Sequence, residues 1–349
     1  PPPPPIFFLM IRRRPRSTLS SSSAASDVYK RKMQNGTYKK LLVYLTHPQV
    51  DAWNFKPKHK GLLESRLSGT TVQICENSKE FKDNLPGADL AIVWFFKEEW
   101  LASAPRLKLI ATPAAGKDWI PWQPPENLKL SFGGFHGPMI SESVLGAMLH
   151  FIKVFSLSKT MQEKKKWARV KISSQQQSLY KSRVTILGFG KIGITLGGLL
   201  KQFGCSITGI KRTEIASPDY FSVEDDILTF DELESVLPET DHFVCALPGG
   251  EETNEIIKPR HFKKLPKTSF LYNVGRGNIY KESDLVHALQ SEEIAGAYLD
   301  VFGEEPLPKA STLWELNNVL IQPHISAASP QYLELFVEEL AKTIKGQAR

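Results

Sequence analysis

The sequence predicts an α/β protein with two lobes, each organised around a doubly wound parallel sheet. Three observations support this fold class. From residue 38 onward, short apolar segments alternate with helical patterns, the order expected when helices connect parallel strands. Residues 183–204 place a strand, a glycine-rich turn and a helix in direct succession. The length of 349 residues suits about two domains of this kind.

The first 37 residues are not expected to take part in the fold. A proline run, an arginine cluster and a serine run cannot bury a core, so disorder is predicted. The Arg-rich, Ser-rich and nearly acid-free composition imitates a mitochondrial transit peptide, which would place the protein in mitochondria if the segment is genuine. The string more closely resembles a translated sequencing-adapter artefact. We interpret residues 1–37 in this second way, with Met33 as the candidate start.

The composition is that of an ordinary globular protein, with 41% hydrophobic and 23% charged residues. No apolar stretch approaches the roughly 18 residues of a membrane span, so no membrane partner is expected. Cys75, Cys205 and Cys245 lie far apart without a C-x-x-C pair. This spacing argues against a disulfide framework and against a metal site, and it favours a reducing, cytoplasmic compartment.

The net charge of +7 does not indicate a nucleic-acid partner. Residues 1–40 hold nine Lys and Arg against Asp27, a net charge of +8, which leaves −1 for the other 309 residues. The globular part is therefore close to neutral, and no nucleic-acid binding is expected from the fold.

Residues 38–136 form the first predicted lobe. Helical patterns at 59–67 and 97–105 separate strands that are expected at 39–48, 71–75, 89–96, 107–116 and 128–134. Ligands of such sheets bind beyond the carboxyl ends of the strands. One such end carries Ala115 and Gly116, whose backbone N–H groups are candidates for binding an anionic substrate, and an ordinary turn is the equal alternative. His136, Trp94, Trp119 and Trp122 are interpreted as packing groups rather than ligands.

The second predicted lobe begins with a long helix at 141–162, for which Ser141 is the candidate N-cap. Its broad apolar surface would serve a lobe junction or a dimer contact. Helical patterns at 231–237 and 282–291 then alternate with strands that are expected at 183–188, 206–210, 242–247, 269–274, 295–300 and 319–323. This alternation is the Rossmann pattern.

The glycines of the central turn have the spacing G-x-G-x-x-G, with Lys191 and Ile192 between the last two. Gly188 permits the tight turn, Gly190 lets the backbone approach a pyrophosphate, and Gly193 allows close packing of helix on strand. The helix N-terminus adds free N–H groups and the positive end of its dipole. The sequence therefore predicts dinucleotide binding, with a ligand-free glycine turn as the alternative.

The residues after the second Rossmann strand favour NADP over NAD. NAD-binding units carry an acidic residue there for the ribose hydroxyls. This chain has Lys211, Arg212 and Thr213 instead, and two cations favour a 2′-phosphate. A solvated pair of surface cations is the alternative, and NAD stays a second choice of cofactor.

Four motifs occur in order, each at the end of a predicted strand: GFGKIG, NVGRGNIY, LDVFGEEPLP and QPHISAAS. Together they closely resemble the D-isomer-specific 2-hydroxyacid dehydrogenases, in particular glyoxylate and hydroxypyruvate reductases, and the resemblance extends from about residue 40 to the end. It implies that Arg276 binds the substrate carboxylate and keto oxygen, that His324 and Glu305 form the acid–base pair, and that Asp300 lies beside the nicotinamide. It also implies cofactor contacts for Leu247, Pro248, Thr253 and Val274.

The chemistry of these side chains supports the implied roles. Arg offers a planar fork to a carboxylate, His titrates near neutral pH and can protonate a keto oxygen, and a carboxylate beside it stabilises the imidazolium. Each residue also has a structural alternative, as a surface cation, a solvated acid, a strand-end histidine or a turn cap.

The resemblance also implies a domain organisation. The substrate domain, with a flavodoxin-like fold, is expected to comprise 38–136 plus 324–349, because the last helix would return to the first lobe. The Rossmann domain at 137–323 would be inserted between these two parts.

The expected activity is NADPH-dependent reduction of a small 2-keto acid, glyoxylate or hydroxypyruvate, by a homodimer. Formate dehydrogenases of this fold pair the histidine with Gln, so Glu305 argues against formate. The alternative is a dinucleotide-sensing scaffold that resembles the C-terminal binding protein corepressors. Selectivity for the substrate side chain is expected to depend on loops around Trp94, Phe95, Trp119 and Met139.

Overall fold

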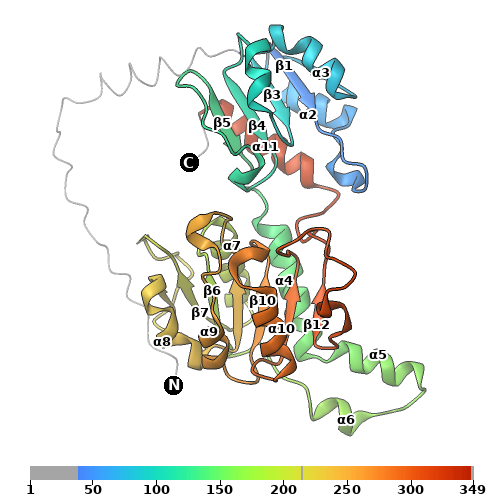
Figure 1. Ribbon diagram of the computed structural model, residues 1–349, viewed down its shortest axis with the longest axis vertical. Coiled ribbons are helices and arrows are strands. Elements are labelled where there is room, and N and C mark those ends of the chain that lie inside the picture. Colours follow the sequence, from blue (N-terminus) through green and yellow to red (C-terminus); the bar gives the residue numbers. More distant parts are fainter. Residues whose placement is uncertain (1–37, 214, 347–349) are drawn as a thin grey trace, which may run out of the picture.

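Two parallel sheets organise the molecule into two lobes (Figure 1). The computed structural model describes residues 38–213 and 215–346. The first sheet has five strands in the order β2-β1-β3-β4-β5, and the second has seven in the order β12-β11-β10-β9-β6-β7-β8. The predicted α/β class with two parallel sheets is therefore confirmed. The interpretation of residues 1–37 and of Met33 concerns residues that lie outside the described part.

Each strand of the first sheet falls inside a predicted segment. The predicted segments are longer because they include apolar residues of the loops that follow the strands. The strands are β1 (Lys40–Tyr44), β2 (Thr71–Ile74), β3 (Leu90–Val93), β4 (Leu109–Thr112) and β5 (Lys129–Phe132). Since β1 pairs with both β2 and β3, the chain direction across the sheet reverses beside β1. This switch point opens a crevice at the carboxyl ends of β1 and β3.

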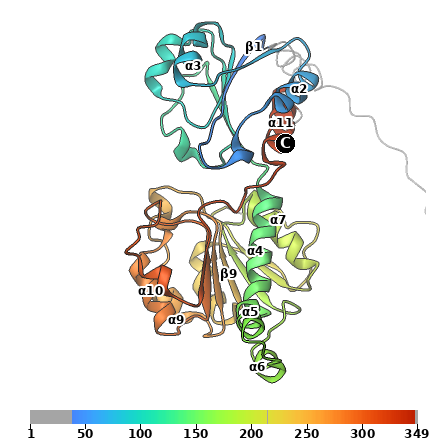
Figure 2. The same cartoon turned by 90° about the vertical axis from the view of Figure 1, so that its right-hand side faces the viewer.

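Helices from both ends of the described chain cover the first sheet. They are α2 (Pro57–Arg66), α3 (Ser78–Asn84) and α11 (Tyr332–Ile344), with 3-10 helices at Asp51–Trp53, Leu85–Gly87, Glu98–Ser103 and Lys117–Trp119. The helical pattern predicted at 97–105 is thus a short 3-10 helix. In Figures 1 and 2, α11 lies beside α2. Two ion pairs of 2.7 Å, Lys58–Glu334 and Arg66–Glu338, connect these helices.

The amphipathic pattern of α11 explains where this helix packs. Leu333, Phe336, Val337 and Leu340 repeat at helical spacing and are buried in the same apolar cluster as Leu41 of β1. The charged face carries the glutamates that pair with α2. The last described helix therefore completes the core of the lobe that the first described residues build.

The second sheet contains all six predicted Rossmann strands and one more. Its strands are β6 (Arg183–Leu187), β7 (Ser206–Ile210), β8 (Asp226–Leu228), β9 (His242–Cys245), β10 (Phe270–Asn273), β11 (Gly296–Leu299) and β12 (Val319–Ile321). The unpredicted strand, β8, is only three residues long at the edge of the sheet, with no fully buried residue. Such a strand leaves little hydrophobic signal in the sequence.

Helices cover both faces of the second sheet, with α4 and α7 on one side and α9 and α10 on the other (Figure 2). The α-helices are α4 (Gly137–Ile152), α5 (Phe155–Glu163), α6 (Arg169–Ser173), α7 (Lys191–Lys201), α8 (Leu233–Val236), α9 (Pro259–Lys264) and α10 (Glu282–Gln290). Further 3-10 helices lie at Phe230–Glu232, Leu237–Glu239, Glu251–Thr253, Gly277–Ile279 and Thr312–Glu315.

The prediction of one helix at 141–162 with Ser141 as its N-cap is wrong. The helix begins at Gly137, where Pro138 suits the first turn because its missing N–H needs no partner there. Ser141 is buried inside the helix. Val154 has a φ of 48°, which ends α4 and starts the separate helix α5. The apolar spacing continues across this break, so periodicity alone conceals it.

Among the described residues, no single helix is long and apolar enough to cross a membrane. Helices α4 and α5 pass the length and composition test only as a pair, and they are bent by 58° with respect to each other.

Candidate functional site

Three neighbouring cavities that share lining residues, together called the channel, lie between the lobes and along the second sheet. The first cavity, of about 340 Å³, lies between the lobes, and the second, of about 230 Å³, lies over the glycine turn. Ile192, Val274 and Arg276 line both. The third, of about 550 Å³, shares Gly188 and Pro248 with the second and extends along the carboxyl ends of β6, β7 and β9. Such an elongated channel suits an extended ligand.

The glycine turn between β6 and α7 has room for a phosphate. Gly188 has a φ of +96°, which L side chains rarely adopt, and a Cβ there would press on the Ala246 carbonyl. Gly190 is the N-cap residue of α7, and no atom lies within 4 Å of where its Cβ would be. Gly193 is buried against the Gly188 carbonyl and lines none of the three cavities. The open space at Gly190, before a helix N-terminus, fits a pyrophosphate.

The two cations predicted for a 2′-phosphate lie at the far end of the channel. Lys211, Arg212 and Thr213 line the 550 Å³ cavity. The Arg212 side chain is 78% exposed and forms an ion pair with Glu252, which lines the same cavity. An anion that binds to Arg212 therefore competes with a carboxylate that is already in place.

The other predicted cofactor residues follow the channel wall. Leu247 and Pro248 come after β9 and line both cavities over the second sheet, and Val274 comes after β10. Thr253 lines the 550 Å³ cavity, and its hydroxyl donates to the Pro248 carbonyl at 2.9 Å, which holds the loop closed on itself. Lys191 lines the middle cavity and reaches Glu339 of α11 at 3.6 Å.

Arg276 extends from the second lobe toward the first. Its Nη1 donates to the Gly275 carbonyl at 2.8 Å, and its Nη2 donates to Asp118 Oδ1 at 3.0 Å. Gly116 permits this approach, because a Cβ at that position would overlap the Arg276 guanidinium. Ala115 and Gly116 both line the cavity between the lobes beside Arg276. The structure thus brings Ala115, Gly116 and Arg276 together, and it adds Asp118, of which the sequence gives no indication.

His324 and Glu305 form a hydrogen-bonded pair at the edge of the same cavity. His324 Nδ1 lies 2.8 Å from Glu305 Oε2, and a second oxygen of Glu305 accepts the Phe302 N–H at 3.0 Å. An ionised carboxylate only accepts, so Nδ1 carries a proton and Nε2 is the nitrogen left for the cavity that His324 lines. Glu305 lies behind the imidazole and does not line the cavity.

Within the pair, the pKa of His324 is raised and that of Glu305 is lowered, so both shifts favour the charged forms. The hydrogen bond to Glu305 raises the pKa of His324 against the effect of burial, and the charges of Glu305 and Asp300 act in the same direction. Burial alone would raise the pKa of Glu305, but the hydrogen bonds from His324 and from the Phe302 N–H outweigh it and lower this pKa. Arg276 opposes the change at His324 by its positive charge.

Asp300 is buried and holds the loop that carries His324. Its carboxylate accepts the Ile325 N–H at 2.8 Å, the Ser326 N–H at 3.0 Å and the Ser326 hydroxyl. Its backbone carbonyl accepts the His324 N–H at 2.8 Å. These bonds fix the unusual φ of 55° at His324. Burial raises the pKa of Asp300, which its hydrogen bonds partly offset.

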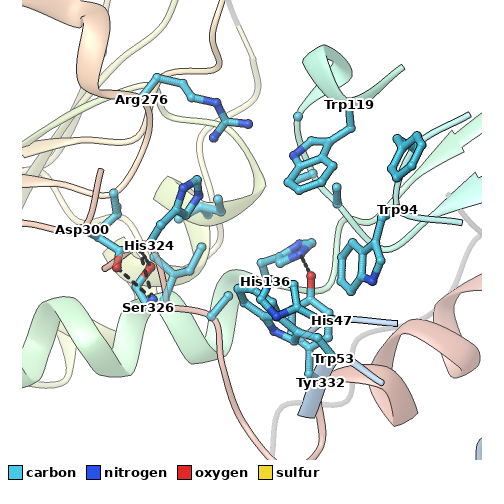
Figure 3. Close-up of a pocket in the computed structure, with 18 of the residues that line it drawn as sticks. His47, Trp53, Trp94, Trp119, His136, Arg276, Asp300, His324, Ser326 and Tyr332 are labelled. Carbon is cyan, nitrogen blue, oxygen red and sulfur yellow. Dashed lines mark hydrogen bonds between the residues drawn. The ribbon is translucent and has the colours of Figure 1, made fainter. Parts of the chain in front are cut away.

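Three of the aromatic groups interpreted as packing residues line the cavity between the lobes: Trp94, Trp119 and His136. In Figure 3, Trp94 and Trp119 lie across the cleft from Arg276 and His324. His136 is buried, its Nε2 lies 3.1 Å from the Tyr332 hydroxyl, and burial lowers its pKa to about 4. The packing interpretation fits Trp122, whose indole donates to the Phe96 carbonyl at 2.7 Å.

Further cavity residues escape the sequence-based prediction: Thr46, His47, Trp53 and Tyr332. They come from the loop after β1 and from α11, so no local motif connects them. The one available signal is the position of Thr46 and His47 just beyond a parallel strand. No group of three or more His, Cys, Asp or Glu side chains in the described ranges is placed to hold a metal ion.

Comparison with known proteins points to one family. Residues 145–326 match the model for the NAD binding domain of D-isomer specific 2-hydroxyacid dehydrogenases, which is just over half of the chain. A glyoxylate/hydroxypyruvate reductase A from Salmonella newport is 30% identical over 295 residues, which cover 81% of this chain and 88% of that protein.

Solved structures agree with this comparison. A D-isomer specific 2-hydroxyacid dehydrogenase family protein from Aeromonas salmonicida is 28% identical, with a TM-score of 0.73 over 89% of this chain and 97% of that one. An NADPH-dependent glyoxylate/hydroxypyruvate reductase from Sinorhizobium meliloti, in complex with NADP and sulfate, is 25% identical, with a TM-score of 0.71 over 88% of this chain and 96% of that one.

Proposed function

Because the chain belongs to the D-isomer specific 2-hydroxyacid dehydrogenase family, we propose that it reduces a small 2-keto acid to the D-2-hydroxy acid with NADPH. Glyoxylate and hydroxypyruvate are the reference substrates, since relatives that carry these names resemble the chain. The observation that carries the proposal is the placement of His324 and Arg276 on one cavity, with Glu305 bonded to His324 from behind, next to the cavity over the glycine turn.

Arg276 is the group that binds the substrate carboxylate. Its guanidinium offers two parallel donors, and Ala115 and Gly116 line the same space from the first lobe, where their N–H groups would add further donors. Nη2 already donates to Asp118, so the substrate carboxylate would replace Asp118 as the acceptor of this hydrogen bond. The substrate carboxylate would thus be held by Arg276 from the second lobe and by the backbone of Ala115 and Gly116 from the first.

His324 supplies the proton to the keto oxygen. His324 lines the cavity and Nδ1 is bonded to Glu305, so Nε2 is the nitrogen left to donate, and Glu305 orients the imidazole and raises its pKa. Asp300 holds the histidine loop and lines the same cavity, and the resemblance implies that it would lie beside the nicotinamide. When bound, the reduced nicotinamide supplies the hydride to the keto carbon.

The dinucleotide is held by residues along the channel. Gly188, Gly190 and Lys191 would hold the pyrophosphate at the start of α7. Ile192 and Val274 would contact the nicotinamide, because they line the cavity that also contains His324. Leu247, Pro248 and Thr253 would contact the adenosine. Lys211 and Arg212 would bind a 2′-phosphate beside Thr213, which favours NADP over NAD.

We further propose that the chain is a homodimer in a reducing compartment, the cytoplasm. Helices α5 and α6 extend away from the second sheet (Figure 1), and this segment carries exposed apolar side chains, among them Val170 of α6 and Trp167 of the loop between the helices, which is 88% exposed. A second copy is expected to cover them. Light scattering should give a dimer mass for the wild type and a monomer mass for Trp167→Asp, and a monomeric wild type would contradict the proposal.

The three cysteines are free and buried, as a reducing compartment allows.

The activity is tested by the consumption of NADPH with a panel of 2-keto acids. The wild type should turn over at least one member, and His324→Ala should lower kcat roughly a hundredfold or more because the proton donor is lost. His287→Ala, an exposed histidine on α10, is the control and should keep full activity. A chain that binds NADPH and reduces no member of the panel would instead fit a dinucleotide-sensing scaffold.

The pH dependence follows from the His324–Glu305 pair. Reduction needs the imidazolium, so kcat/KM should stay high at low pH and fall as pH rises through the raised His324 pKa. Glu305→Gln removes the negative charge that raises this pKa, so the fall should begin at lower pH. Glu304→Gln changes the exposed neighbour and should keep the wild-type profile. Identical profiles for the Glu305 variant and the wild type would refute the assigned role.

The choice of cofactor is tested by measured dissociation constants. Arg212→Ala should weaken NADPH binding roughly five- to tenfold, the loss of about one charge-assisted hydrogen bond at an exposed site, and leave NADH almost unchanged. Glu252→Gln should tighten NADPH binding, because it removes the competing carboxylate. Lys267→Ala, an exposed lysine that lines none of the three cavities, serves as the control. Tighter binding of NADH than of NADPH by the wild type would rule out the proposed preference.

A further inference from the structure

The first-lobe side of the cavity between the lobes carries an aromatic wall, made of Trp53, Trp94, Phe95, Trp119 and Tyr332. Trp94 is its centre, with ring centroids at 5.8 Å from Trp53, 5.9 Å from Trp119 and 6.2 Å from Tyr332. The wall combines the loops after β1, β3 and β4 with the first residue of α11. Its members Trp94 and Trp119 lie across the cleft from Arg276 and His324 (Figure 3).

Two members of the wall have apolar surface that the fold itself does not use. Phe95 is 46% and Trp119 39% exposed. Within the described residues, neither belongs to any of the four hydrophobic clusters of the protein. Trp53 and Trp94 do pack against the first-lobe core and support the wall from behind. Apolar side chains that are left exposed inside a cleft are typical of a ligand site.

The reacting groups fix the direction in which a substrate side chain points. A 2-keto acid has three groups on its keto carbon: the carboxylate, the keto oxygen and the side chain. With the carboxylate at Arg276 and the keto oxygen at His324 Nε2, both on the second lobe, the side chain is directed toward the first lobe. The aldehyde hydrogen of glyoxylate would leave the wall uncovered. A ring on the side chain would cover Trp119 and Phe95.

We propose that this site prefers 2-keto acids with an aromatic side chain, the arylpyruvate class, over glyoxylate. The preference rests on the proposed reductase function. It adds to that function a contact between the aromatic wall and the substrate side chain. Arg276 and His324 recognise the 2-keto acid group that all such substrates share. The aromatic wall selects the side chain by burying apolar surface and by ring stacking at edge-to-face or offset geometry.

The test compares pyruvate with phenylpyruvate, which differ only by the phenyl ring, and adds glyoxylate. With saturating NADPH, kcat/KM for phenylpyruvate should exceed the values for pyruvate and glyoxylate by at least about tenfold, since burying a ring is worth roughly one to two powers of ten. Trp119→Ala should remove most of this advantage and change kcat/KM for glyoxylate much less. Trp314→Ala, an exposed tryptophan of the second lobe, should leave all three values unchanged.

Binding provides a readout that does not depend on turnover. With NADP⁺ in place of NADPH, calorimetric titration should give a dissociation constant for phenylpyruvate about tenfold below that for pyruvate, and Trp119→Ala should equalise the two. Equal or tighter binding of the smaller acid, or a preference that Trp119→Ala and Phe95→Ala both leave intact, would overturn the proposal. Absence of turnover with every 2-keto acid would instead refute the reductase function, and the binding arm would still decide the selectivity.

Discussion

One buried carboxylate, that of Asp300, determines the shape of the site. It lies at the end of β11 and accepts three hydrogen bonds from Ile325 and Ser326 in the loop after β12. Without these bonds, the left-handed backbone of His324 would have no compensation for its strain. The same loop leads on to α11, which completes the core of the first lobe. A single set of hydrogen bonds therefore positions both the imidazole of His324 and the segment that leads from the second lobe to α11.

Two ion pairs connect the two lobes at the site. Arg276 of the second lobe pairs with Asp118 of the first, and Lys191 approaches Glu339 of α11. Such partly exposed ion pairs contribute about 1 kcal/mol or less each, because water screens them and the side chains lose rotamer freedom. These contacts therefore hold the lobes near each other only weakly. A ligand that binds both sides of the cleft can replace them at little energetic cost.

The sequence predicts the groups that belong to continuous motifs and misses those that only the fold assembles. The glycine turn, Arg276 and His324 each follow a strand with a strong apolar pattern, so their place at one edge of a parallel sheet is foreseeable. Of the aromatic wall, the sequence indicates only the loops around Trp94, Phe95 and Trp119, and no periodicity connects them with Trp53 and Tyr332. Trp94 and Trp119 suggest packing when they are considered singly, because large aromatic residues usually lie in cores. The break at Val154 is hidden for a related reason, since apolar spacing does not report backbone conformation.

The charges around His324 also connect substrate binding to proton donation. Glu305 and Asp300 raise the pKa of His324, and Arg276 lowers it. A substrate carboxylate that pairs with Arg276 would cancel part of this opposing positive charge and would add a negative charge close to the imidazole. Both effects raise the pKa of His324 further. The imidazolium would therefore be stabilised most strongly in the complex that needs its proton, so that Arg276 acts on the acid as well as on the substrate.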